Sequence, residues 1–329
     1  MESTRKRFRP DRAGVIDVAR LAGVSTATVS RVLNHSRLVR PEVCERVWAS
    51  AKQLNYQLNS AARDLARSRS SMVLLEVSDP AHMTFSHAAL LRTLASRILA
   101  RGEFPTIISP DLLASNENAA TLGMVATAAG AVSIETTSIP GRLQSNALPH
   151  VVVDAAEEES VSAVVLDRRR AYARVAEHLL RNNHRRIGYI GSESDVKYLG
   201  LSETAKAGGA RCTVVPERNL APFLHSERKA SRVTAWVLPG ELIVVPTVMQ
   251  LLAAGRRIGI DTAVVCQGDS QLARCAVPPL TALRHPNDLI ANIALDLLSA
   301  QQADRRKRQR VTVDLELVVR ASSDFQVRN

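Results

Sequence analysis

The stretch VARLAGVSTATVSRVLN, residues 18–34, starts with the apolar spacing of a helix, breaks at Gly-Val-Ser, and resumes with short polar groups. An apolar side predicts the first helix, and it consists of Ile16, Ala19, Leu21 and Ala22. Gly23 permits a tight turn, and Ser25 is a good N-cap for a second helix. The second helix has its own apolar stripe, made by Val29, Val32 and Leu33. The pattern therefore predicts two short helices that meet at a sharp angle.

The other side of the second helix carries groups that can hydrogen-bond base edges or contact a thymine methyl without holding the helix away from a groove. The candidate DNA-reading residues are Thr26, Ala27, Thr28, Ser30, Arg31 and Asn34. The alternative is an ordinary two-helix corner whose polar residues face water. Charge favours DNA, because residues 1–70 hold fourteen Lys and Arg against six Asp and Glu, which is +8 of the chain's formal charge of +11. We therefore interpret the pattern as a helix-turn-helix.

The segments on either side of this motif extend the prediction. Residues 1–13, with the basic run RKRFRPDR, are expected to be disordered, as a leader or as an arm that contacts phosphates. Residues 40–56 predict a third helix with Val43, Val47, Ala51 and Leu54 on one side. Together the three helices form a small all-α head piece.

From residue 71 the periodicity changes to short apolar strands that alternate with longer helical patterns. The first series includes MVLLEV, PTIIS, GAVSIE and HVVVD, and the second includes RIGYIG, CTVV, VTAWVL and TAVVCQGD. Continuous apolar strands between helices predict parallel sheets covered on both faces, so we expect two doubly wound α/β subdomains. A ligand would bind between them, at the carboxyl ends of the strands.

Several motifs occur here in the order of one known family. They are VIDVARLAGVSTATVSRVLNHSRLVRPEV, LNYQLNSAARDLARSRS, HVVVD, DRRRAYARVAEHLLRNNHRRIGYIG, PPLTALRHP and LELVVRAS. Over residues 14–323 the chain resembles the LacI/GalR family of bacterial transcription repressors, and the head-piece motif is the most specific part of the match. The resemblance implies a DNA-binding domain at 14–58, a hinge at 59–70, and a periplasmic-binding-protein-like core at 71–329. It divides the core into residues 71–156 plus 286–309 and residues 163–284 plus 311–329, with crossings near 155–162, 284–286 and 309–311.

The segment NSAARDLARSRS, residues 59–70, is short and capable of forming a helix that orders on docking. In related proteins this helix pairs with its dimer mate in the minor groove and inserts a leucine between base pairs. The resemblance gives this role to Leu65, with Asn59 as a cap and with Ala61 and Ala62 small enough for close approach. The alternative is a flexible linker.

The resemblance is weaker at the effector pocket. Sugar-responsive members hold their ligand with an arginine, an Asn-Asp pair and an Asp, and the matching positions here are Lys197, Gly240-Glu241 and Gly268 followed by Asp269. Lys197 lacks the guanidinium fork of an arginine, and Gly268 lacks the carboxylate acceptor of an aspartate. We therefore expect the effector to be an anionic metabolite or absent, and not a neutral sugar. The alternative is that Glu241 and Asp269, each one position along, restore the acceptors. Pro246 is expected to interrupt a helix here.

Composition and motifs argue against several other classes of protein. There is no apolar run of membrane-spanning length and no secretory h-region, so we expect no membrane partner and a cytoplasmic, nucleoid-associated bacterial protein. The four cysteines have no metal-ligand spacing and are expected to be reduced and mostly buried, and His178 and His184 are expected to be structural. No dinucleotide, P-loop or nucleophile-elbow motif is present, so we predict no enzyme, no cofactor, no catalytic residue and no metal. The basic run RRKRQR, residues 305–310, is expected to be a solvated crossover loop.

These observations lead to one hypothesis. We expect a homodimer that binds a pseudo-palindromic double-stranded DNA operator as a repressor, with affinity modulated by a small-molecule effector in the cleft between the subdomains. The alternative is a ligand-sensing binding protein of the same fold whose DNA binding is vestigial. A tetramer is not expected, because the C-terminal sequence has no heptad repeat.

Overall fold

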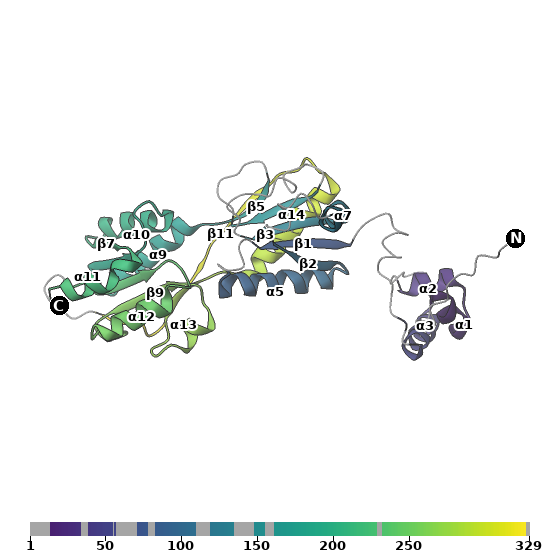
Figure 1. The fold of residues 1–329 in the computed structure, drawn as a ribbon, viewed down its shortest axis with the longest axis horizontal. Helices are drawn as coiled ribbons and strands as arrows, with labels where there is room; N and C mark the ends of the chain where they lie inside the picture. Colours follow the sequence, from purple (N-terminus) through teal and green to yellow (C-terminus); the bar gives the residue numbers. More distant parts are fainter. Residues whose placement is uncertain are drawn as a thin grey trace. The chain divides into compact units, whose positions relative to one another are not determined.

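The computed structural model describes residues 14–33, 39–54, 56, 71–77, 83–109, 119–134, 148–154, 161–228 and 232–326. The chain divides into two compact units, Met1–Arg69 and Ser70–Asn329 (Figure 1). Each unit is built around its own hydrophobic core.

The first unit is a cluster of short helices. They are α1 (Val15–Ala22), α2 (Thr26–Leu33) and α3 (Pro41–Gln53). Gly23 ends α1 in the left-handed region at φ 67°, and its N–H bonds to the carbonyls of Ala19 and Arg20. Ser25 then caps α2, because its hydroxyl accepts the N–H of Thr28 at 3.1 Å.

The core of this unit confirms the stripe predicted for α2 but corrects the one predicted for α1. The fully buried apolar residues are Val18, Ala19, Ala22, Val29, Val32, Leu33, Val47 and Ala51. Ile16 and Leu21, which were expected inside, are exposed, and Val18 is buried in their place. The spacing of Val18 and Ala22 matches one helical face, and Ile16 and Leu21 flank it.

The second unit contains two sheets with helices on both faces, as predicted, and each sheet has six strands. The first sheet has the order β11-β5-β4-β3-β1-β2 with every neighbour parallel. Its strands are β1 (Met72–Val77), β2 (Phe104–Ile108), β3 (Gly130–Ile134), β4 (His150–Val153), β5 (Ser162–Leu166) and β11 (Arg310–Val313). Helices α5 (Phe85–Ala100) and α14 (Asn287–Ala303) cover one face, and α7 (Ala119–Thr127) lies on the other. We call this sheet and its helices the first subdomain.

The second sheet has the order β12-β10-β9-β8-β6-β7, in which only the β10–β12 pair is antiparallel. Its strands are β6 (Arg186–Ile190), β7 (Arg211–Val215), β8 (Ala235–Leu238), β9 (Ala263–Gln267), β10 (Thr281–Arg284) and β12 (Glu316–Val318). Helices α9 (Arg168–Arg181) and α10 (Val196–Ala207) cover one face. The other face packs against α11 (Leu220–Ser226) and α12 (Val244–Ala253), with the 3₁₀ turn η2 (Glu217–Asn219) before α11 and the short α13 (Gln271–Cys275) after β9. We call this half the second subdomain.

Two of the expected crossings between the subdomains are misplaced. Strand β5 pairs with β4, so the chain leaves the first subdomain after Leu166 and not near 155–162. Strand β11 pairs with β5, so the last crossing runs through Asp314 and not through 309–311. The cause is that both strands are short, β5 being mainly apolar and β11 alternating between polar and apolar residues, so pairing with a neighbouring strand and not the local pattern chooses their sheet. Residues 305–309 of the basic run consequently form a largely exposed loop within the first subdomain, Arg310 begins β11, and the run is not a crossover.

Two further expectations change. Pro246 does not interrupt a helix, because it lies in the first turn of α12, where a backbone N–H has no intrahelical partner. Among the cysteines only Cys266 is buried, and Cys275 is exposed.

Within the described ranges no helix is long and apolar enough to cross a bilayer. The same residues contain no group of three His, Cys, Asp or Glu side chains placed to hold a metal ion.

Candidate functional site

The first candidate site is the surface of α2 opposite its buried stripe. Thr26, Ala27, Ser30 and Arg31 are exposed there, while Val29, Val32 and Leu33 face the core. Thr28 is half-buried, and its hydroxyl lies 2.9 Å from that of Ser25, so it also takes part in the cap. The helix therefore presents two hydroxyls, a methyl group and a guanidinium on one accessible side, which suits close approach to a groove.

Other predicted DNA-contacting residues lie outside the described part of the chain. They are Asn34 and the residues of the predicted hinge, Asn59, Ala61, Ala62 and Leu65.

The second candidate site lies where the two subdomains meet, near the carboxyl ends of the strands of the second sheet. In each sheet the strand order reverses beside the first strand, β1 or β6, and such switch points are where ligands bind in open α/β sheets. Three side chains were predicted to hold an effector there: Lys197, Glu241 and Asp269. Each of them is engaged by another group of the protein.

Lys197 lies in the first turn of α10, the helix that follows β6. Its Nζ donates to the carbonyl of Pro239 at 2.9 Å, just after β8. Asp195 caps the same helix by accepting the N–H of Lys197 at 3.0 Å, and it also accepts the hydroxyl of Tyr189 at 2.6 Å. The ammonium therefore ties α10 to the end of β8.

Glu241 links the two subdomains. Its side chain is 7% exposed, and its carboxylate accepts the backbone N–H of Ser86 at 3.2 Å and the Ser86 hydroxyl by a short hydrogen bond. Ser86 lies in the first turn of α5, so the carboxylate also meets the positive end of that helix. Charge-assisted hydrogen bonds of this kind are among the stronger polar contacts in a protein.

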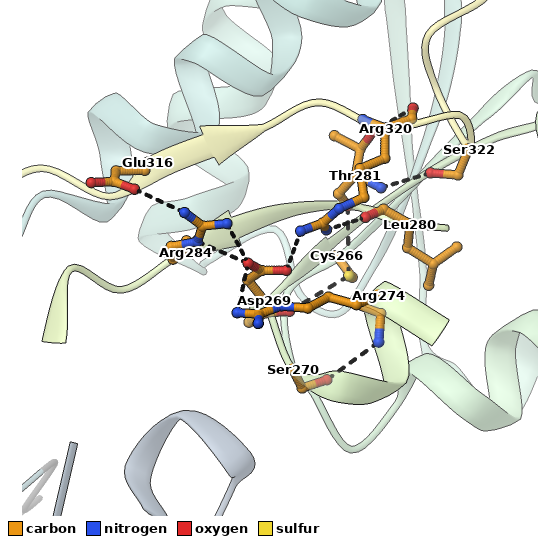
Figure 2. Close-up of polar contacts among 12 residues, drawn as sticks. Cys266, Asp269, Ser270, Arg274, Leu280, Thr281, Arg284, Glu316, Arg320 and Ser322 are labelled. Atoms are coloured by element: carbon orange, nitrogen blue, oxygen red, sulfur yellow. Dashed lines mark hydrogen bonds and ion pairs between the residues drawn. The ribbon is translucent and has the colours of Figure 1, made fainter. Parts of the chain in front are cut away.

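Asp269 is the centre of a cluster of guanidinium groups (Figure 2). Its carboxylate is 2% exposed and is contacted at 2.6 Å by Arg320, at 2.7 Å by Arg284 and at 3.0 Å by Arg274. Burial alone would raise the pKa of this carboxyl, but the hydrogen bonds from the three guanidiniums lower it below its ordinary value. The carboxylate is therefore ionised, and its charge is already paired with arginines of the protein.

A cleft with a volume of about 810 Å³ opens beside this cluster. One wall is α5, and the others are the segment from Asp269 to Arg274, the β10–α14 connection and Glu316. The sequence prediction named Asp269 in this region but missed Ser86, Arg274, Arg284 and Arg320. No local spacing could reveal them, because they come from four distant segments of the chain.

The comparisons with known proteins agree with this two-part organisation. The family model described as bacterial regulatory proteins, lacI family, matches residues 15–59, and the model of a periplasmic binding protein-like domain matches residues 176–323. The HTH-type transcriptional regulator CelR of Thermobifida fusca is 28% identical, over 93% of this chain and 96% of the relative. The HTH-type transcriptional repressor PurR of Aliivibrio salmonicida is 23% identical, over 94% of this chain and 98% of the relative.

Solved structures show the same fold over nearly the whole chain. A lac repressor dimer bound to operator and the anti-inducer ONPF has a TM-score of 0.72 at 19% identity, covering 95% of this chain and 99% of its own. A complex of the transcriptional regulator CelR with cellobiose has a TM-score of 0.63 at 24% identity, covering 94% of this chain and 100% of its own.

Proposed function

Because the chain belongs to the lacI family of bacterial regulatory proteins, we propose that its α2 surface reads the base sequence of an operator while its core senses a small molecule. The protein is a DNA-binding transcriptional regulator of that family. We also propose how this chain binds its operator, how it assembles and what controls it.

The exposed side of α2 is the observation that carries the DNA-reading role. A buried apolar stripe fixes the orientation of the helix, so Thr26, Ala27, Ser30 and Arg31 face outward together. A guanidinium can donate two hydrogen bonds to guanine O6 and N7, which gives about 1–3 kcal/mol of base discrimination. We assign base reading to Arg31 and Ala27, and phosphate or base contact to Thr26 and Ser30. Leu65 and its neighbours remain predicted minor-groove contacts.

A dimer follows from the need to read two half-sites and from an exposed apolar stripe on α12. Leu242 in the turn just before α12, and Val245, Met249 and Leu252 on the helix, are all exposed by about half or more of their surface. They recur with the three- and four-residue spacing of one helical face. A second copy of this chain would cover such a stripe in a two-fold interface, and the similar lac repressor was solved as a dimer on operator.

The effector is assigned to the cleft between the subdomains, where a ligand that contacts both would bias their arrangement. The relatives are regulators and not enzymes, and we propose that this chain likewise performs no catalysis and acts on DNA in the cytoplasm. Operator binding as a repressor, relieved or strengthened by that ligand, is the activity that the two sites support.

Selection of genomic DNA tests the proposal. The purified full chain is incubated with sheared genomic fragments, and the retained fragments are sequenced. We expect a shared pseudo-palindrome and a steep loss of retention as salt rises, because phosphate contacts release counterions. The control is Thr26→Glu, whose added carboxylate suits a helix N-terminus but repels phosphates. Equal retention by this variant, or no shared sequence among the fragments, would contradict the proposal.

A further inference from the structure

Guanidinium groups from both subdomains line the cleft beside Asp269. Arg92 comes from α5 in the first subdomain, Arg274 from α13 and Arg284 from the end of β10 in the second. Arg92 is exposed, and the side chains of Arg274 and Arg284 are 56% and 41% exposed. These three guanidiniums supply the accessible positive charge on the walls of this cleft.

The nearby carboxylates do not cancel that charge. Asp269 is 2% exposed and is shared by three guanidiniums, since Arg320 approaches it from behind with a side chain only 17% exposed. One negative charge thus faces three positive ones. The buried position of Asp269 also means that an incoming anion would meet the arginines before it met this carboxylate.

The two remaining carboxylates of the lining are weakly placed or already paired. Glu316 is 55% exposed and lies 3.6 Å from Arg284, which is longer than a direct hydrogen bond. Asp288 is 82% exposed and pairs at 2.7 Å with Arg97, which lies one turn beyond the lining part of α5. Counted with Arg320 and Arg97, which pair with Asp269 and Asp288 from outside the lining, five guanidiniums meet three carboxylates.

The lining also contains a buried acceptor that lacks a hydrogen-bond donor. The Oδ1 atom of Asn287, at the start of α14, is buried and has no hydrogen-bond partner among the described residues. A buried acceptor without a partner is destabilising, and a ligand hydroxyl or water would satisfy it.

We propose that this cleft binds a small anionic metabolite, carrying a carboxylate or a phosphate, between Arg92 of the first subdomain and Arg274 and Arg284 of the second. The inference rests on the proposed effector-sensing role and identifies the chemistry of its ligand. Guanidinium forks match both anion types by paired hydrogen bonds, and the site is distinct from the Lys197 position, whose ammonium binds Pro239. Because the anion bridges the two subdomains, its binding stabilises the arrangement in which they are close.

Calorimetric titration of the full chain at constant ionic strength tests this site. The probes are citrate for carboxylates, inorganic pyrophosphate for phosphates, and glucose as the neutral reference. The variants are Arg92→Gln and Arg274→Gln, and the matched control is Arg211→Gln, which changes an exposed arginine on β7. Thermal unfolding confirms that each variant is folded, and Arg92→Gln carries the test if Arg274→Gln unfolds.

We expect at least one of the two anions to bind the wild-type chain at least tenfold more tightly than glucose, and the identity of that anion separates carboxylate from phosphate recognition. Arg92→Gln and Arg274→Gln should each raise its Kd at least tenfold, and Arg211→Gln should change it less than twofold. Absence of anion binding, or equal weakening by all three variants, would overturn the inference. Retention of genomic DNA is measured on the same samples with and without anion. Loss of DNA binding under both conditions refutes the regulator role, while retained DNA binding without anion binding refutes only this site.

Discussion

The side chain of Glu241 lies over the backbone of Gly268, in the space that a Cβ at position 268 would occupy. From there its carboxylate reaches the N–H of Ser86 in the other subdomain at 3.2 Å. The glycine therefore has two functions, since it adopts φ +88° and leaves room for the link between the subdomains.

Replacing Gly268 with alanine should destabilise the core and break this link. The new Cβ would overlap the Glu241 side chain and would force a non-glycine residue into the left-handed region, which costs about 1–3 kcal/mol. Urea unfolding of the variant measures the loss. The control is Gly240→Ala, where no atom lies within 4 Å of the added Cβ, and we expect a change below about 0.5 kcal/mol there. Equal effects at the two glycines would contradict the packing argument.

A double-mutant cycle measures the contact between Glu241 and Ser86. The variants are Glu241→Ala, Ser86→Ala and their combination. Ser86→Ala removes the hydroxyl that donates to the Glu241 carboxylate and keeps the backbone N–H, and we expect a coupling of about 1–3 kcal/mol in the free energy of unfolding, because the acceptor is charged and buried. A parallel cycle that pairs Ser86→Ala with Glu217→Ala, which changes an exposed residue of η2, should give no coupling. A coupling near zero in the first cycle would mean that the contact does not hold the subdomains together.

Arg31→Ala should relax the operator preference at one symmetric pair of positions. The cost is about 1–3 kcal/mol at those positions if the guanidinium binds a guanine edge. Selection from a randomised operator library, sequenced before and after retention, makes the comparison with the wild-type chain. A uniform loss of affinity with unchanged sequence preference would instead identify Arg31 as a phosphate contact.

Met249→Arg should weaken the dimer. Met249 is 62% exposed in the centre of the α12 stripe, and a charge buried there without a partner would cost about 3 kcal/mol, or roughly a hundredfold in the dimer Kd. Light scattering across a dilution series measures the mass, and the wild-type chain should give twice its 35.8 kDa. Gln250→Arg, one residue along the same helix, is the control and should remain dimeric. A Met249→Arg variant as tightly dimeric as the control would place the interface elsewhere.

The core should lose stability below pH 6.5 because of buried histidines. Burial lowers the pKa of His150 and of His184 from 6.5 to about 4, and it also lowers the pKa of His178. Between these values the unfolded chain binds protons that the folded chain does not, so stability falls as pH falls from about 6.5 to about 4. The loss is up to about 3 kcal/mol each for His150 and His184.

Urea unfolding from pH 7.5 to pH 4.5 measures this slope. The variant His184→Gln should have a shallower pH dependence than the wild-type chain, whatever its stability at pH 7.5. The exposed His225 gives the control, and His225→Gln should keep the wild-type slope. Identical slopes in both variants would show that His184 does not govern acid sensitivity.

The helix-turn-helix could be predicted from the sequence because its determinants are local. Gly23, Ser25 and the stripe of Val29, Val32 and Leu33 act within one or two turns of helix, and the structure has each of them in the expected role. The error at Ile16 and Leu21 has a tertiary cause, since a helix of eight residues offers two overlapping apolar faces and only packing against α2 and α3 selects one.

The alternation of apolar strands with helices likewise determined two doubly wound sheets, because continuous apolar runs cannot remain exposed. Only the tertiary structure decided which sheet receives β5 and β11, since backbone pairing distinguishes two equally apolar partners by geometry alone. The same holds for the cleft, where Glu241 meets Ser86 from 155 residues away and Asp269 meets Arg320 from 51 residues away. The sequence shows which side chains are charged, but folding brings distant segments together and thereby determines which charges neutralise one another and which remain available to a ligand.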